Sequence, residues 1–380
     1  MKPRRKGAAS PDYYEEWMSG EGIPIHEAVA GIDDVTELPR KSWARTGGAG
    51  VFIQLLGPQQ AERGIYVGEI PGGKALEPEK HLYQEVIVIL RGLGSTEVWQ
   101  EGMPKRTFEW GEGSVFAPPL NCWHRMINGS REPALFLAVT TAPKAMNLFC
   151  GDDVVFNCEH RFLNHFNGEA DYFVPTQKRE KMGRYSTLWY TNFIADAKDV
   201  LLDNQEQKVS GGQITGYRMA NGFPSGHISE WPAGRYHKAH YHGPGAILVG
   251  LEGEGYVLVW PHTIGIHPYQ NGEEDKVLKI NWGPRSIYSP PDAWFHQHFN
   301  GGSRPARHLA VYGASSGVPG YTDSVGQDFS GTVSFREGGT LIDYADEDPQ
   351  IRKNFAEALK QKGIPLQMPA VKYIEIDTNV

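Results

Sequence analysis

The chain of 380 residues is 40% hydrophobic and 22% charged, with a formal net charge of −8 and a sequence pI near 6.0, a composition typical of a globular protein. The acidic charge disfavours nucleic acid or an anionic membrane surface as a partner, and no apolar run approaches the roughly 20 residues of a membrane span. The first residues lack the apolar core of a secretory signal and three cysteines are too few for a disulfide framework, so we expect a cytoplasmic protein with reduced thiols.

Short strands separated by Gly, Pro and Asn are predicted along most of the chain. Residues 1–45 form a predicted N-terminal arm with a short helix that begins near Asp12. A first series of strands is predicted at residues 51–56, 65–70, 85–90, 95–99, 114–119 and 134–139. A second series is predicted at residues 227–231, 246–251, 255–260, 285–291 and 307–312. Residues 150–215 connect the two series, and residues 321–380 form an extension with an exposed helix. This pattern favours a sandwich or a barrel.

The two series of strands carry matching residues. At an offset of 161, the pairs are Glu69 and Glu230, Gly73 and Gly234, Gly92 and Gly253, and Trp99 and Trp260. After one insertion, the offset becomes 172 and the pairs are Pro119 and Pro291, His124 and His296, and Asn128 and Asn300. A period this long is not that of a solenoid, so it predicts a duplicated domain.

Three histidines of the second half have the spacing of a metal site. His240 and His242 lie two residues apart, which places them on one face of an extended segment. His296, from a later strand, can complete three ligands on one side of an ion. The other side stays open, as in a catalytic rather than a structural metal site.

The spacing Gly-x5-His-x-His-x(3,4)-Glu-x6-Gly, followed by Gly-x5-Pro-x-Gly-x2-His-x3-Asn, is the motif pair of the cupin superfamily, and the chain resembles a bicupin that carries it twice. The resemblance implies an all-β fold of two cupin (double-stranded β-helix, jelly-roll) barrels with short peripheral helices. The N-terminal cupin would span residues 46–149 and the C-terminal cupin residues 216–320, which holds the metal site of His240, His242 and His296.

The two copies depart from the motif at different positions. The C-terminal copy has Ala246 where the family has glutamate. In the N-terminal copy, glutamate replaces the first histidine, so a second metal site would consist of Glu79, His81, Glu85 and His124. The alternative is a barrel without metal, in which Glu79 and Glu85 pair with bases such as Lys80 or Arg125.

Three neutral imidazoles leave a divalent ion with its full charge, which favours an anionic, bidentate substrate and leaves room for dioxygen. We therefore expect a small anionic substrate and a divalent metal, Fe(II) first, with Mn, Ni or Zn as alternatives. The resemblance to gentisate-type and other three-His non-haem iron enzymes favours a dioxygenase that cleaves a C–C bond of an oxygenated aromatic or dicarbonyl compound. A non-oxidative isomerase, decarboxylase, lyase or hydrolase is the first alternative, and a non-enzymatic small-molecule-binding cupin is the second. We also expect a homo-oligomer.

Two further histidines lie close to the ligand set in sequence. His298 follows His296 by two residues, so it should share the inward face and serve as a catalytic proton shuttle or hydrogen-bond partner, or pack in the barrel. His237 precedes His240 by three residues, an odd spacing that predicts an exposed side chain.

Overall fold

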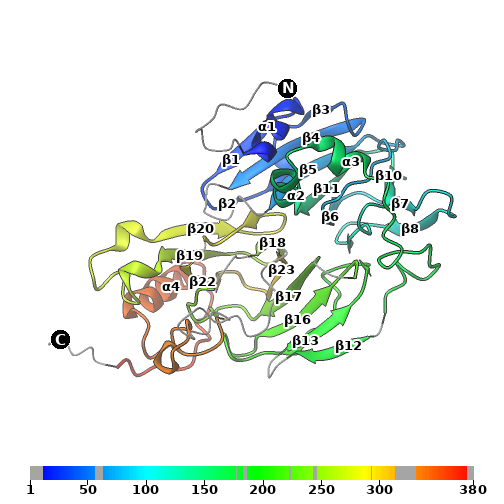
Figure 1. Ribbon diagram of the computed structural model, residues 1–380. Helices are drawn as coiled ribbons and strands as arrows, with labels where there is room; N and C mark the ends of the chain where they lie inside the picture. The colour runs from blue at the N-terminus through cyan, green and yellow to red at the C-terminus, as the bar shows by residue number, and fades with distance from the viewer. Residues whose placement is uncertain are drawn as a thin grey trace. The chain divides into compact units, whose positions relative to one another are not determined.

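The computed structural model describes residues 12–55, 63–176, 178–182, 186–221, 224–242, 246–291, 293–312 and 331–374 (Figure 1). The chain divides into two compact units. The first consists of residues 1–27, 38–54 and 60–174, and the second of residues 28–37, 55–59 and 175–380. The domain limits given by the motif copies stay a prediction.

The first unit is built from two antiparallel sheets. Its strands are β1 (Ile25–Ala28), β3 (Lys41–Trp43), β4 (Gly48–Leu55), β5 (Gly64–Ile70), β6 (Glu85–Arg91), β7 (Gly94–Trp99), β8 (Arg106–Trp110), β9 (Val115–Phe116), β10 (Trp123–Asn128) and β11 (Ala134–Thr140). One sheet has the order β1-β4-β5-β11-β6-β9, with β3 beside β4, and the other has the order β10-β7-β8. Three short helices accompany them, α1 (Tyr13–Gly20), α2 (Ala142–Phe149) and α3 (Asp152–Asn157). The side chain of Asp12 caps α1 by accepting from the backbone N–H groups of Tyr14 and Glu15.

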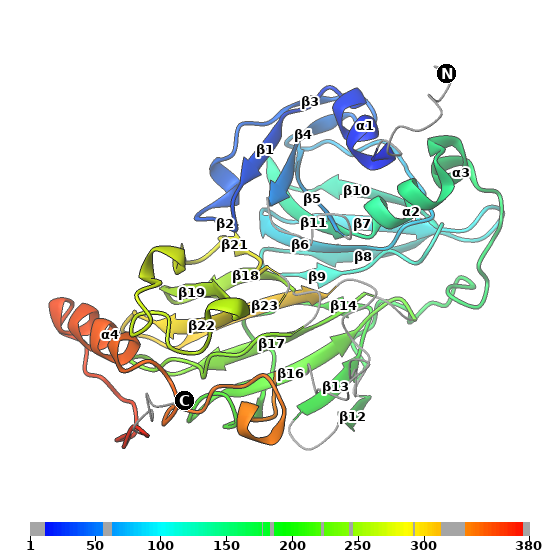
Figure 2. The ribbon, with the colours of Figure 1, turned by 60° about the vertical axis from the view of Figure 1, so that its left-hand side comes forward.

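The second unit repeats this plan. Its strands are β2 (Gly31–Ile32), β12 (Arg179–Met182), β13 (Ser186–Tyr190), β14 (Phe193–Ile194), β15 (Asp203–Asn204), β16 (Gln213–Arg218), β17 (Ser225–Trp231), β18 (Ile247–Glu252), β19 (Gly255–Pro261), β20 (Leu278–Trp282), β21 (Ile287–Tyr288), β22 (Trp294–Asn300) and β23 (Ala306–Tyr312). The larger sheet has the order β12-β13-β16-β17-β23-β18-β21-β2, and the smaller has the order β20-β19-β22. The predicted C-terminal helix is α4 (Pro349–Gln361), which lies beside β19 and β22 (Figure 2). It is not exposed on all sides, because Ile351, Phe355 and Leu359 are buried against that sheet.

The two barrels correspond strand for strand. The order β4-β5-β11-β6-β9 in the first matches β16-β17-β23-β18-β21 in the second, and β10-β7-β8 matches β22-β19-β20. The predicted fold class, two all-β barrels of the cupin type with short peripheral helices, is therefore confirmed, and the chain has a bicupin architecture.

The matched motif residues have structural roles. Gly92 and Gly253 both have positive φ, and a Cβ would lie 2.7 Å from the Ala134 side chain at the first and 2.8 Å from the Ala306 backbone at the second. The buried side-chain amide of Asn128 donates to backbone carbonyls that include those of Ile70 and Glu132, and that of Asn300 donates to those of Trp231 and Arg304. These residues hold the turns that bring the strands of each barrel together. Among the helices that the structure describes, none is long and apolar enough to span a membrane.

Candidate metal centres

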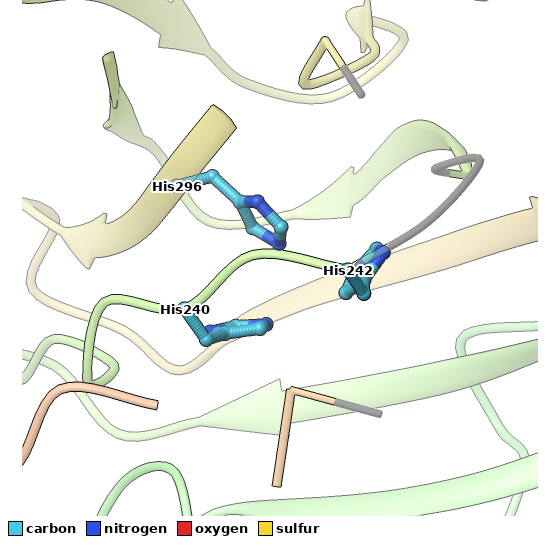
Figure 3. Close-up of side chains that lie close together, drawn as sticks. All are labelled: His240, His242 and His296. Carbon is cyan, nitrogen blue, oxygen red and sulfur yellow. The ribbon is translucent and has the colours of Figure 1, made fainter. Parts of the chain in front are cut away.

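The three histidines predicted in the C-terminal barrel lie together. One ring nitrogen from each of His240, His242 and His296 lies within 4.8 Å of the others (Figure 3). Backbone pairing brings two of these residues together. The N–H of His296 donates to the carbonyl of His240 at 2.8 Å, and the N–H of His240 donates to the carbonyl of His296 at 3.2 Å. The segment that precedes β18 is therefore paired with β22 at His240 and His296.

The hydrogen bonds of the rings identify which nitrogen faces the shared space. Nδ1 of His240 lies 3.0 Å from the carbonyl oxygen of Lys238, and Nδ1 of His296 lies 3.2 Å from that of Trp294. A carbonyl oxygen only accepts, so Nδ1 carries the proton and Nε2 offers its lone pair to the centre. Burial, with smaller contributions from neighbouring cations, holds the pKa of both rings well below the ordinary value. The rings are therefore neutral, the form that binds a metal.

Lys208 is a cationic residue of this centre that sequence reasoning missed. Its Nζ donates to Nε2 of His240 at 2.8 Å. Burial lowers the pKa of Lys208 to about 8, so the ammonium form still predominates at neutral pH. Lys208 lies in the connecting segment 150–215, where no motif or periodicity marks it. Only the folded chain brings it to His240.

His298 shares the inward face of β22 with His296, as the alternation predicted. The two ring centroids are 5.5 Å apart, and the Tyr288 hydroxyl lies 3.0 Å from Nδ1 of His298 and 2.8 Å from Nδ1 of His308. A hydroxyl donates only one proton, so it donates to one of these rings and accepts from the other. The network fixes the orientation of His298 behind the ligand set, and the catalytic role predicted for it stays a prediction.

The expectation that His237 is exposed is wrong. Its ring lies 4.5 Å from that of Trp231 and 5.4 Å from that of His298, inside the barrel, and burial holds its pKa well below the ordinary value. The alternation of faces applies to a regular strand, but this segment forms only isolated bridges, at Tyr236 and His240. The irregular backbone turns His237 inward.

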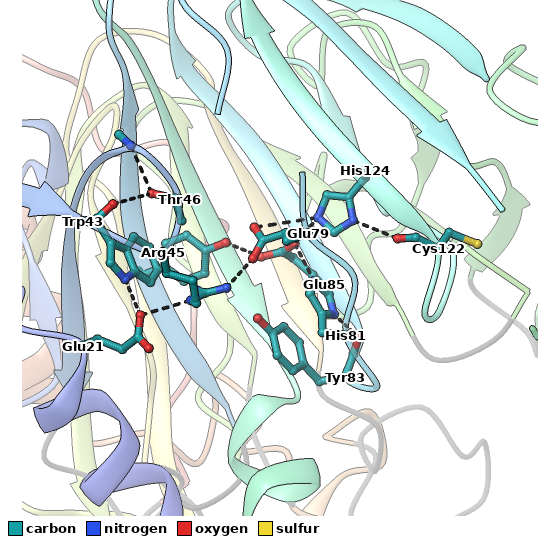
Figure 4. Close-up of polar contacts among 12 residues, drawn as sticks. Glu21, Trp43, Arg45, Thr46, Glu79, His81, Tyr83, Glu85, Cys122 and His124 are labelled. Atoms are coloured by element: carbon teal, nitrogen blue, oxygen red, sulfur yellow. Dashed lines mark hydrogen bonds and ion pairs between the residues drawn. The ribbon is translucent and has the colours of Figure 1, made fainter. Parts of the chain in front are cut away.

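The N-terminal barrel also brings a ligand set together (Figure 4). His81, Glu85 and His124 form a second group whose ligand atoms lie within 4.8 Å of one another. Nδ1 of His81 lies 2.8 Å from the carbonyl oxygen of Tyr83, and Nδ1 of His124 lies 3.2 Å from that of Cys122, so both Nε2 atoms face Glu85. The Tyr66 hydroxyl donates to Oε1 of Glu85 at 2.5 Å.

Glu79 lies at the edge of this second group. The bridge between Glu79 and His124 has the backbone pairing of His240 and His296, so Glu79 occupies the position of a histidine ligand. Its Oε1 lies 4.0 Å from Nε2 of His124, but its Oε2 forms an ion pair with Arg45.

The partner of Glu79 is therefore Arg45, and not one of the bases named in the sequence alternative. Arg45 also binds Glu21 at 3.0 Å and lies 4.7 Å from the centroid of Trp43. Lys80 donates to the carbonyl of Cys158, and Arg125 pairs with Glu97. The carboxylate beside the N-terminal group is thus already paired with a protein cation.

Both groups fit a divalent cation. In the N-terminal barrel, Nε2 of His81 and Oε2 of Glu85 are buried, lie 3.5 Å apart and have no hydrogen-bond partner among the described residues, as expected of atoms that share an ion. In the C-terminal barrel, the neutral rings of His240 and His296, with fixed tautomers, converge with His242, and Ala246 occupies the position that corresponds to Glu85. The first set is two imidazoles and a carboxylate, and the second is three imidazoles.

No protein-family model matches the chain, and no curated protein matches it. Solved structures similar to it include a variant of the oxalate decarboxylase of Bacillus subtilis, with 13% identity and a TM-score of 0.48. Another is a Bacillus subtilis oxalate decarboxylase structure from work on its Mn(II) centres, with 13% identity and a TM-score of 0.49. Each alignment covers 75% of this chain and 77% of that chain. Because these scores are below 0.5, the fold assignment depends on the strand order and motifs of the chain itself. Those make it a bicupin in architecture, with a candidate metal centre in each barrel.

Proposed function

We propose that the protein is a metal-dependent enzyme that acts on a small carboxylic acid and that the C-terminal centre is its reaction site. The observation that carries the proposal is the convergence of His240, His242 and His296, without a carboxylate in the group. A centre of neutral ligands keeps the full charge of its ion, and that charge attracts an anionic substrate.

His240, His242 and His296 would hold the ion, which would supply positive charge to an oxygen of the substrate as a Lewis acid. Other residues of the chain orient the ligands and add charge. The carbonyls of Lys238 and Trp294 hold two of the rings in the ligating tautomer. Lys208 adds a cation beside His240. Burial of His240 and His296 strengthens the electrostatic attraction to an acid.

We place a non-oxidative reaction first, of the decarboxylase, lyase or isomerase type. What supports it is the ammonium of Lys208 beside the ligand set, because two adjacent cations stabilise the electron pair that remains when a bond next to a carboxylate breaks. The Bacillus subtilis neighbours are named for the decarboxylation of oxalate, but a likeness at this level carries no argument about the reaction of this chain.

The second candidate is the Fe(II) dioxygenase expected from the sequence, with dioxygen as co-substrate. Two observations favour it. Ala246 leaves the C-terminal centre with three protein ligands, and the set of His81, Glu85 and His124 is the two-histidine, one-carboxylate combination of many Fe(II) oxygenases. That set is also our proposed second metal site, and homo-oligomer formation stays a prediction.

Metal analysis and aerobic and anaerobic assays test the proposal together. Protein loaded with Mn, Fe, Ni or Zn would be incubated with a panel of small mono- and dicarboxylic acids under nitrogen and under air, with carbon dioxide and dioxygen measured. We expect turnover under nitrogen that is lost in His242→Ala. Turnover that requires dioxygen and consumes it in proportion to product would favour the second candidate. Failure of every metal-loaded form to convert any acid would reject the first.

A further inference from the structure

Lys208 is a cation beside the C-terminal centre. Its Nζ donates to Nε2 of His240 at 2.8 Å, and among the described residues no carboxylate forms an ion pair with it. Arg45, the cation beside the N-terminal centre, differs in this respect because it binds both Glu79 and Glu21. A charge removed from water is normally paired, so the ammonium of Lys208, beside a ligand histidine, is suited to bind an anion that enters the centre.

The rings around Lys208 do not supply the missing negative charge. His298 and His308 are buried in the same barrel, His227 and His237 are half-buried there, and an imidazole is either neutral or positively charged. Neutral imidazoles accept hydrogen bonds but do not offset a positive charge. With a divalent ion on the three ligand histidines, the centre would hold three positive charges and no described carboxylate within the ligand group.

The backbone of Lys208 is held at the centre by hydrogen bonds. Its carbonyl accepts from the N–H of Lys238 at 2.8 Å and from the Tyr344 hydroxyl at 3.1 Å. An ion bound to Nε2 of His240 would take the lone pair that the ammonium now uses. The ammonium would then need another partner, and its anchored backbone keeps that partner close to the ion.

We propose that Lys208 determines substrate specificity by binding a second acid group of the substrate, so that the C-terminal centre selects a small dianion over a monoanion. One acid group would face the ion, and the other would pair with Lys208. This inference rests on the proposed function and narrows its substrate class. A dianion offsets two of the three positive charges, whereas a monocarboxylate offsets only one.

The test measures anion binding and does not depend on turnover. Protein would be loaded with Co²⁺, whose visible absorption reports on its ligands, and the part of the spectrum that is absent in His242→Ala assigned to the C-terminal centre. That band would be titrated with malonate and with acetate in the wild-type protein and in Lys208→Met, Lys208→Arg and Lys279→Met. Lys279 is an exposed lysine on β20 and serves as the control for loss of one positive charge.

We expect Lys208→Met to weaken malonate binding by about 10- to 100-fold, the range for loss of a hydrogen bond between charged groups. Acetate binding should change by less than about threefold on the same reasoning, and Co²⁺ should bind as tightly as in the wild type or more tightly. Lys208→Arg should recover part of the malonate affinity, and Lys279→Met should bind both anions as the wild type does.

Equal malonate affinity in Lys208→Met and the wild type would overturn the inference, as would equal losses for malonate and acetate. If malonate selectivity depends on Lys208 but no acid is converted by any metal-loaded form, the inference holds and the proposed function fails. If no Co²⁺ band is sensitive to His242→Ala, the centre does not bind metal and both fail.

Discussion

In the N-terminal barrel, carboxylates belong to the candidate centre, whereas in the C-terminal barrel the corresponding positions are neutral. Glu85 lies inside the first group and Glu79 lies beside it, paired with Arg45. The corresponding positions in the second barrel are Ala246 and His240, and the nearby cation, Lys208, has no described carboxylate partner. Strand order and backbone bridges are the same in both barrels. A duplicated scaffold therefore fixes where ligands meet, and a few side chains decide whether the centre needs an external anion.

Loss of a ligand should separate the roles of the two centres most strongly. We expect His242→Ala to lower the turnover of a small acid by at least about 100-fold. Loss of a residue that only hydrogen-bonds to a metal ligand already lowers activity by up to about 100-fold, and loss of the ligand itself should cost more. His124→Ala should lose one metal ion per chain but less activity. Metal content and kcat/KM would be measured for both, with the exposed His160→Ala as control. If His124→Ala lost more activity than His242→Ala, the reaction site would lie in the N-terminal barrel instead.

Removal of Arg45 should break the charge balance of the N-terminal centre. In Arg45→Met, Glu79 and Glu21 lose their shared cation and the contact with Trp43 weakens. We expect the free energy of unfolding to fall by about 3 kcal/mol, the lower end for a broken buried ion pair. Urea denaturation of the metal-free protein measures it, and Arg45→Lys, which keeps the charge, should lose less. A stability within about 0.5 kcal/mol of the wild type would show that the pair is solvated.

The C-terminal barrel keeps a buried carboxylate outside its centre. Gln297 lies between His296 and His298 on β22 and faces the other way, where its amide donates to Glu347 at 3.1 Å. Tyr236 also donates to Glu347, and burial raises the pKa of this carboxyl to about 7 from an ordinary 4.5.

The native state consequently binds more protons at Glu347 than the unfolded chain between about pH 4.5 and 7, so stability falls as the pH rises through this interval. We expect a fall of about 2 kcal/mol between pH 5 and 7 that is absent in Glu347→Gln. Parallel pH profiles of stability for the two proteins would contradict this assignment. The profiles should be measured without metal.

A carboxylate introduced at Ala246 should make the second centre resemble the first. The position is buried and corresponds to Glu85, so Ala246→Glu supplies a fourth ligand and lowers the charge of the centre by one. We expect divalent metal to bind about 10-fold more tightly, a gain near 1.4 kcal/mol, and malonate to bind more weakly. Ala246→Gln has the same bulk without the charge. Equal metal affinities of Ala246→Glu and Ala246→Gln, measured by calorimetry, would show that a carboxylate at this position does not bind the ion.

Local patterns in the sequence determined the architecture and the positions of the candidate ligands. The paired glycines, prolines and asparagines mark the same turns in both halves, and residues such as Gly92 and Gly253 are required by a positive φ and close packing that few other residues tolerate. The candidate ligands His240, His242 and His296 could be chosen in advance, and so could His81, Glu85 and His124, although Glu79 was predicted with them and lies outside the group. Side chains alternate between the two faces of a regular strand, and this rule correctly placed His298 on the same face as His296.

The tertiary structure alone decided the charge around each centre. Lys208 and Arg45 reach the ligand sets from segments outside the motifs, and contacts between residues so far apart leave no periodic signal in the sequence. Glu79 matches a ligand position, yet its pairing with Arg45 could be seen only after folding. His237 was misplaced because alternation describes regular strands and not the irregular segment in which it lies. Spacing along a chain fixes which side chains a scaffold can bring together, whereas burial and charge depend on every neighbour that folding adds.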